Sequence, residues 1–307
     1  MPSEQPTAHP ASNSFGGQAV VEGVMIRGPR SIAVAVRTPD GEIMIRTRGL
    51  GGRLTNLVRR IPLVRGMLVL WETLAIGIWA LAWASAVHNE EVDEHGEAKP
   101  FGVAGWLVLL VVLGFAVTVF FAGPVLVTAW LSGLLPDLLV IAIEGLVRLG
   151  LLLGYIRLIG RSPEVRRVFQ YHAAEHKAVQ ALEQGRELSV QAVRRLPKEH
   201  PRCGTSFLLT VAVVAAIAFM FAGTEPLWWR FASRIVLIPV IAAVSYEAIR
   251  FGGLHLGNAI VRTLFSANLA LQKLTTSDPD DEQIQVAIAS LNAALEVERE
   301  AAEAASS

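Results

Sequence analysis

The sequence has little cysteine, little charge, and no excess of charge of either sign. Its 307 residues include one cysteine, Cys203, which excludes an internal disulfide and therefore the small disulfide-stabilised secreted folds. The 27 basic and 27 acidic residues cancel, so the charge gives no reason to expect a nucleic-acid partner. Charged residues make up 18% of the chain, whereas soluble domains carry about 25%.

Apolar residues are abundant instead. They form 52% of the sequence, and the mean hydropathy is +0.46. A soluble protein of this length could not bury so much apolar surface and still keep a wettable exterior. The composition therefore predicts an α-helical multi-pass membrane protein surrounded by a lipid bilayer.

The first 62 residues precede the long apolar stretches. Residues 1–14 are rich in Pro, Ser and Thr and lack the basic start and apolar run of a secretory signal, so we expect a disordered tail. Residues 15–62 are expected to form a small polar-faced β unit on the cytoplasmic side. Within it, Ser31–Arg37 and Glu42–Arg46 flank a Pro-Asp-Gly turn, which is the pattern of a β hairpin.

Residues 63–265 are expected to form the membrane domain. Its first apolar stretch, Leu63–Val87, carries Arg65 and Glu72 and has three tryptophans on one helical face, so we expect it to lie in the interface or to enter the membrane only partly. Four stretches remain as full spans, since about 20 residues cross a hydrocarbon core of about 30 Å. They are Gly102–Phe121, Pro136–Tyr155, Ser206–Ala222, and Phe231–Ser245 extended to Ile249.

The distribution of basic residues predicts the orientation. Arg27–Arg65 and Arg157–Arg202 are rich in Arg and Lys, which favour the cytoplasmic side. Four spans then leave both termini in the cytoplasm, together with a motif-bearing segment at 161–205. Residues 266–307 are expected to form a cytoplasmic amphipathic helix that docks on the rest of the protein, with a start signal at Ser277-Asp278-Pro279.

The strongest chemical signal is the sequence YHAAEH at 171–176. His172 and His176 are four residues apart, so on a helix both imidazoles face one side and can bind one metal ion. Glu175 lies on an adjacent face, where it can serve as the general base for a metal-activated water. The order H-x-x-E-H is that of the inverzincin metallopeptidases, in which a distant carboxylate supplies a further ligand.

Three further groups are predicted at the same membrane depth as these histidines. His200 and Cys203 come directly before the third span, and imidazole and thiolate are both ordinary zinc ligands. Glu247, 71 positions after His176, lies at the cytoplasmic end of the fourth span and offers the carboxylate. The sequence therefore predicts a zinc-type site formed by His172 and His176 and completed by Glu247 or by the His200–Cys203 pair.

Each of these residues also has a plain structural interpretation. The two motif histidines can be surface residues of a solvated helix next to the membrane. Cys203 can be a small packed residue at the start of a helix. Glu247 can pair with Arg250, which follows it by three positions.

Four separated segments resemble one bacterial family. They are GGQAVVEGVMIRGP, YHAAEHKAV, HPRCGTSFLL and LTTSDPDDEQIQVAI. From about Phe15 to Leu295 the chain resembles the membrane family catalogued as domain of unknown function 1385, whose members are often labelled predicted metal-dependent enzymes. The resemblance implies that Glu22 and Arg27 belong to the signature segments, along with His172, Glu175, His176, His200 and Cys203. The chain differs from the family pattern at Ala173, where Gly is usual, and at 266–268, where Ser-Ala-Asn replaces the Pro-Gly turn that usually precedes the Leu-Gln-x-Leu-Thr-Thr segment.

These features predict a metal-dependent membrane enzyme at the cytoplasmic face of the bacterial inner membrane. The expected reaction is hydrolysis of a peptide or lipid-linked bond, with zinc as the metal, Glu175 as the catalytic base and a membrane protein or peptide as substrate. A second hypothesis is a non-enzymatic assembly or scaffolding factor, in which the histidines form a structural metal site or a polar network. A third is a transporter whose pathway includes Glu144 and Arg148, although two charges four residues apart can also neutralise each other.

Overall fold

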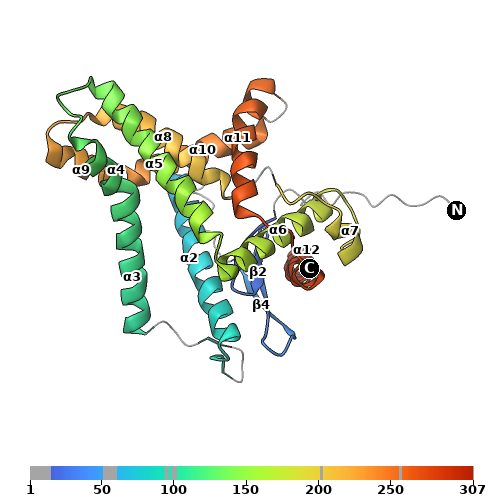
Figure 1. The fold of residues 1–307 in the computed structure, drawn as a ribbon. Helices are drawn as coiled ribbons and strands as arrows, with labels where there is room; N and C mark the ends of the chain where they lie inside the picture. Colours follow the sequence, from blue (N-terminus) through green and yellow to red (C-terminus); the bar gives the residue numbers. More distant parts are fainter. Residues whose placement is uncertain are drawn as a thin grey trace.

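The computed structural model describes residues 15–50, 61–93, 97–98, 102–200, 203–255 and 258–306. The tail expected at residues 1–14 lies outside the described residues. The chain is mostly helical, and a small sheet formed by its N-terminal part lies beside the C-terminal helix (Figure 1).

The sheet is an antiparallel meander of four strands. They are β1 (Gly16–Val20), β2 (Gly23–Arg27), β3 (Ser31–Arg37) and β4 (Ile43–Gly49). The predicted hairpin is confirmed, because β3 pairs with β4 from Arg37–Ile43 to Ser31–Gly49. The glycine-rich segment ahead of it forms a second hairpin, in which only Val21 and Glu22 connect β1 to β2.

The expectation of a polar-faced β unit is wrong. All residues of β3 from Ser31 to Val36 are buried, because helices cover both faces of the sheet. One face packs against the C-terminal half of α2 (Val64–His88), and the other packs against α6 (Pro163–Glu183) and α12 (Asp281–Ser306). A strand buried on both faces has a nearly continuous apolar run in place of an alternating pattern, which is what SIAVAV shows.

The C-terminal helix docks on this sheet and on α6. Ile284 and Leu291 of α12 are fully buried in the core shared by the three elements. The helix begins at Asp281, two residues after Pro279, which the start signal predicted as the first helical position. Asp280 caps it, because its carboxylate accepts a hydrogen bond from the Gln283 amide at 2.8 Å while the Gln283 side chain accepts one from the Asp280 amide at 3.0 Å.

Three helical stretches are long and apolar enough to cross a membrane. They are α2, the stretch Val103–Ala129, and α5 (Asp137–Ile159). The second consists of α3 (Val103–Val117), a π-helical turn at Thr118–Ala122 and α4 (Gly123–Ala129). In length and apolarity α2 is therefore a full candidate span, where the sequence predicted an interfacial or partly inserted helix.

The last two predicted spans differ from simple helices. The apolar part of α8 (Ser206–Ala222) is shorter than the candidate spans. The predicted fourth span is divided into α9 (Leu227–Val236) and α10 (Ile238–Leu254), which meet at an angle of 47°. Pro239 at the start of α10 has no amide hydrogen to continue the preceding helix, which accounts for the break. Two further helices, α7 (Val190–Arg194) and α11 (Ala259–Thr275), complete the chain.

Candidate metal centre

The histidine motif lies in the middle of α6. Pro163 occupies the first turn of this helix, where its missing amide hydrogen costs nothing. The face with Tyr171, Ala174 and Ala178 packs into the core with the sheet and α12. The neighbouring face presents His172 and His176, whose ring centroids are 4.4 Å apart. The prediction that both imidazoles share one side of a helix is confirmed.

Two backbone carbonyls orient the histidine rings. Nδ1 of His172 lies 2.9 Å from the carbonyl oxygen of Thr275, and Nδ1 of His176 lies 2.6 Å from that of Lys198. A carbonyl only accepts hydrogen bonds, so each Nδ1 carries the hydrogen and each neutral ring has its lone pair on Nε2. This is the arrangement that protein metal sites use to aim Nε2 at an ion.

Cys203 faces the two Nε2 atoms. Its Sγ lies 3.1 Å from Nε2 of His172, and it also accepts a hydrogen bond from the Thr205 amide at 3.3 Å. The ligand atoms of His172, His176 and Cys203 all lie within 4.8 Å of one another. A tetrahedral zinc with ordinary bond lengths keeps its ligand atoms roughly 3.3–3.6 Å apart, so this donor set fits zinc in its chemistry, while the widest-spaced of its atoms would have to move closer together to bind one ion.

One atom of this group is left without a partner. Among the described residues, Nε2 of His176 is buried and has no hydrogen-bond partner. A buried polar atom normally has one, since leaving it unsatisfied costs about 1–3 kcal/mol. A ligand between His176 and Cys203 would satisfy this lone pair.

Glu175 lies beside this orphaned atom. Its Oε2 is 3.7 Å from Nε2 of His176, and its carboxyl is almost completely buried. Burial raises the pKa of Glu175, while the nearby imidazoles of His172 and His200 and a hydrogen bond from the Gly17 amide act in the opposite direction without outweighing it. A carboxyl group with a raised pKa next to the candidate ligands has the properties of a general base.

His200 lies close to the centre but faces away from it. Its ring centroid is 5.7 Å from that of His176, while its Nε2 lies 3.1 Å from the carboxylate of Glu183. Gln272 of α11 holds the His200 backbone from both sides, with two hydrogen bonds of 2.8 Å. Of the predicted His200–Cys203 pair, the cysteine therefore joins the ligand group, and the histidine is held next to it.

Glu247 is not part of the described ligand group, so its predicted place as a third ligand is corrected. It forms an ion pair with Arg65, with Nε and Oε1 2.7 Å apart, and accepts a hydrogen bond from the Leu63 amide. The cause is the packing of α2 against α10, where Gly66 lies against Ala243. The sequence suggested Arg250 as the partner of Glu247, but the cation is Arg65, in the first turn of α2.

Glu22 and Arg27 also lie in ion pairs away from the histidines. Glu22, in the turn between β1 and β2, binds Arg167 through both carboxylate oxygens and accepts a hydrogen bond from the Tyr171 hydroxyl at 3.2 Å. Partial burial opposes its ionisation, but Arg167 and Tyr171 together hold the pKa of Glu22 below its ordinary value. Arg27 of β2 binds Glu72 of α2 at 2.7 Å.

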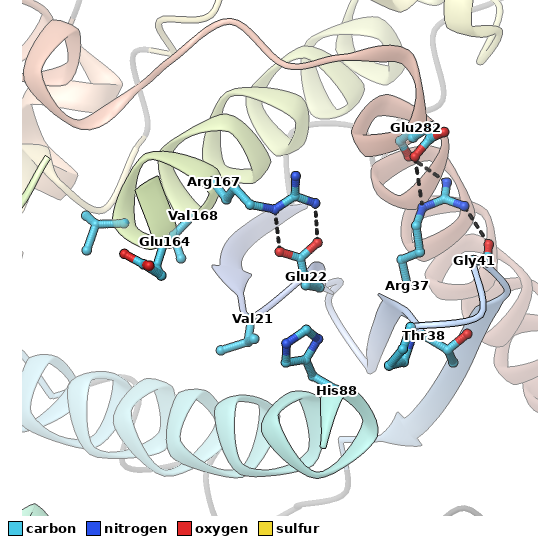
Figure 2. Close-up of a pocket in the computed structure, with 12 residues that line it drawn as sticks. Val21, Glu22, Arg37, Thr38, Gly41, His88, Glu164, Arg167, Val168 and Glu282 are labelled. Carbon is cyan, nitrogen blue, oxygen red and sulfur yellow. Dashed lines mark hydrogen bonds and ion pairs between the residues drawn. The ribbon is translucent and has the colours of Figure 1, made fainter. Parts of the chain in front are cut away.

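The Glu22–Arg167 pair lines a cavity of about 690 Å³ (Figure 2). His88, at the end of α2, and Arg37, at the end of β3, lie on other sides of the same cavity. Glu22 adopts a positive φ of 49°, which is uncommon outside glycine. The signature residue Glu22 therefore connects α6 to the sheet one turn before the histidines.

Glu144 and Arg148 belong to a larger buried charge cluster. The pair itself is confirmed at 3.0 Å, but Arg230 and Arg234 of α9 bind the same carboxylate at 3.1 and 3.0 Å. Arg148 also donates a hydrogen bond to the carbonyl of Phe120, which is the group that Pro124 cannot reach as a helical donor. One carboxylate thus joins three guanidinium groups from two helices.

The residues that sequence reasoning missed are mostly the supporting ones. The carbonyls of Thr275 and Lys198 carry no side-chain signature, and Glu183 and Gln272 are ordinary residues in their local sequence. Arg230 and Arg234 had a usable signal, since they are four residues apart between apolar neighbours. Gln272 lies two residues before Leu274, where the LTTSD segment quoted above begins, and this was the nearest sign of its role.

The comparisons with known proteins agree on one family. Residues 61–297 match the family described as "Protein of unknown function (DUF1385)". The chain belongs to this family. It is also 36% identical over 303 residues to "Uncharacterized protein YqhQ" of Bacillus subtilis (strain 168), a match that covers 94% of this chain and 95% of the relative. No solved structure matches the chain significantly.

Membership of the DUF1385 family confirms the resemblance seen in the sequence. The matched region runs from the residues before α2 to the last third of α12, and it includes all three candidate ligands. Neither description names an activity, so the function must be argued from the site.

Proposed function

We propose that this protein is a membrane-bound, zinc-dependent hydrolase whose metal is held by His172, His176 and Cys203. The observation that carries the proposal is the buried, unpartnered Nε2 of His176, which faces a second imidazole nitrogen and a thiol. Both rings are fixed by carbonyl groups in the tautomer that ligation needs. Two imidazoles and one thiolate form a three-residue set known from catalytic zinc sites, which keep a fourth position open.

The chemistry of a bound zinc ion would be to lower the pKa of water to near 7. Glu175 is the residue of this chain that can take the proton, because its carboxyl lies within 4 Å of the ligand group and burial raises its pKa. His200 and Glu183 form a second imidazole–carboxylate pair next to it. Their role is to hold the segment that carries Cys203 in position against α6.

A structural zinc site is the second candidate function. The two histidines come from α6, Cys203 comes from the segment before α8, and a carbonyl at the end of α11 orients His172. A metal there would fasten three segments together, as expected in an assembly or scaffolding factor. A Glu175→Gln variant separates the two candidates, because it removes the base and leaves all three ligands in place.

We propose four membrane crossings for the surrounding helices. The sheet, α6 and α12 share one core, so they must lie on one side of the membrane. An even number of crossings must therefore separate the sheet from α6, which means two of the three candidates α2, α3–α4 and α5. The chain between α6 and α12 must also cross the membrane an even number of times. Either α8 and the α9–α10 pair both cross it, or neither does.

Of the three candidates before α6, α2 is the helix that does not cross the membrane. Its C-terminal half contributes Ala80, Trp83, Ala84 and Val87 to the core with the sheet, so that half has no complete lipid-facing surface. Aromatic residues lie at both ends of the other two candidates, α3–α4 and α5. Trp130 and Trp228 are exposed where α4 meets α9, and Trp106 and Tyr155 are exposed near the opposite ends of α3 and α5. This supports four crossings with the sheet, α6, α12 and both termini in the cytoplasm of a bacterial cell.

The first experiment measures zinc in detergent-purified protein by mass spectrometry. We expect about one zinc per chain in the wild type and almost none in a His172→Ala/His176→Ala double variant. The matched control is His88→Ala/His255→Ala, which removes two exposed imidazoles outside the ligand group and should keep the zinc. Absence of zinc from the wild type after incubation with zinc salts, or equal zinc in both double variants, would overturn the proposal.

The second experiment compares the wild type with Glu175→Gln in a hydrolysis screen of peptides and lipid-linked substrates. Both proteins should contain equal zinc. Turnover by the wild type that falls at least a hundredfold in the variant supports the hydrolase. Equal turnover, or loss of thermal stability on chelation with no turnover at all, supports the structural site.

A further inference from the structure

The junction between α5 and α6 carries a patch of free arginines. Arg157 lies in the last turn of α5, Arg161 in the short connection, and Arg166 in the first turns of α6. All three are exposed, and within the described part of the chain none of their side chains has a hydrogen-bond or ion-pair partner. We refer to these three residues as the α5–α6 arginine patch.

The patch has almost no compensating charge along the chain. Glu164 is the single acidic residue between positions 145 and 174, and the Ser162 hydroxyl binds it. The adjacent Arg167 is already bound by Glu22. Two or three positive charges therefore remain unmatched within ten residues, which is unusual in a chain whose total charge is zero.

The position of the patch along α5 indicates what faces it. Leu151, Tyr155 and Leu158 are exposed apolar or aromatic residues on the last turns of this candidate span. Tyrosine favours the level of the lipid headgroups, and the arginines begin two residues beyond Tyr155. Long arginine side chains at that depth reach the phosphate layer.

We propose that the α5–α6 arginine patch binds the headgroups of anionic phospholipids and so attaches the start of α6, and with it the histidine site, to the membrane surface. The inference rests on the proposed crossing of the membrane by α5, but not on a bound metal. Guanidinium groups bind phosphate oxygens in pairs of hydrogen bonds, and a cluster of basic residues directly after a span is typical of sites for acidic lipids.

The test uses full-length protein in dodecyl maltoside and adds dioctanoyl-phosphatidylglycerol or dioctanoyl-phosphatidylcholine at equal concentrations. We expect phosphatidylglycerol to raise the thermal unfolding midpoint more than phosphatidylcholine, and inorganic phosphate to have no such effect. Arg157→Gln/Arg161→Gln should need roughly 30-fold more phosphatidylglycerol for the same shift, since each arginine near an anionic surface contributes about fivefold. Arg186→Gln/Arg195→Gln removes two exposed, unpaired arginines elsewhere and should behave like the wild type.

The lipid experiment can fail or succeed independently of the zinc experiment. The zinc-free His172→Ala/His176→Ala variant should keep the difference between the two lipids, and Arg157→Lys/Arg161→Lys should keep part of it, because the charge remains but the paired hydrogen bonds to phosphate are lost. Equal shifts with both lipids in the wild type would overturn the inference. So would an equal loss of response in the Arg186/Arg195 control, because the effect would then depend on total charge alone.

Discussion

Gly17 is the residue whose small size most directly supports the site. A methyl group there would lie 2.5 Å from the carbonyl oxygen of Met25 and 2.7 Å from Cγ of Glu175. Both distances are shorter than real contacts, so either the β1–β2 pair or the buried carboxyl would have to move. The glycine lets the strand approach α6 closely enough for its amide to bind Glu175.

We therefore expect Gly17→Ala to destabilise the protein by about 1–3 kcal/mol, as overpacking of a core does. Zinc content should fall as well, since Glu175 is next to His176. Gly16→Ala is the matched control, because a methyl group on Gly16 meets nothing within 4 Å. Thermal unfolding and metal analysis of the two variants measure the difference, and equal behaviour would show that the contact has no effect on the site.

For single residues, the sequence predicted the site correctly where the side-chain type and its spacing alone determine the geometry. The four-residue spacing of His172 and His176 was sufficient to predict their shared face, because helical geometry determines it. The sequence did not show which of Cys203 and Glu247 would join the histidines, since both are ordinary ligand types at the end of an apolar stretch. It depended on whether Arg65 would reach Glu247, and that follows from how α2 packs on α10.

The helices are held together at one end by the buried Glu144 cluster. Three guanidinium groups surround one carboxylate, and Phe219 lies under two of them, 4.5 Å from Arg234 and 4.8 Å from Arg148. The hydroxyl of Thr128 accepts a further hydrogen bond from Arg230. These bonds connect α4, α5 and α9, so they favour a structural role for the cluster.

We expect Glu144→Gln to lower the free energy of unfolding by about 3–5 kcal/mol, because it leaves three buried cations without their anion. The measurement is denaturation of the detergent-solubilised variant against the wild type. Glu187→Gln, at an exposed glutamate after α6, removes the same charge and should change stability by less than about 0.5 kcal/mol. A small loss in Glu144→Gln would mean that the arginines find other partners or bound anions.

Helices and strands could be predicted from the sequence where their hydrophobic pattern was long and local. The hairpin of β3 and β4 and the apolar stretches were found because alternation, turn residues and long uncharged runs are local signals. The break at Leu237 was not found, although Pro239 is a local signal for it, and the burial of both sheet faces was not found either. The apolar run of β3 was a local signal for burial on both faces, but no local pattern identifies α2 and α12 as the helices that cover it.

At the scale of the whole molecule, the proposed topology predicts which connections face outward. Leu134, between α4 and α5, should be outside, while Glu91, after α2, and Glu187, after α6, should be inside. Single cysteines at these three positions can be labelled in intact cells with a membrane-impermeant maleimide, since Cys203 is buried and should react little.

Only the cysteine at 134 should react before the cells are disrupted. Labelling at 91 in intact cells would mean that α2 crosses the membrane, which would contradict the packing of its second half on the sheet. Labelling at 187 with none at 134 would reverse the orientation and place the histidine site outside.

The pairing of the first strands with the last helix also determines the order in which the protein can mature. The Ser31 hydroxyl binds the Glu298 carboxylate at 2.9 Å across 267 residues of sequence, and the Ser290 hydroxyl binds the Ala33 carbonyl. During synthesis one face of the sheet must therefore stay uncovered until α12 has left the ribosome. A nascent chain arrested before residue 281 should expose that face to chaperones and proteases, so the histidine site can reach its finished geometry only after α12 has been made.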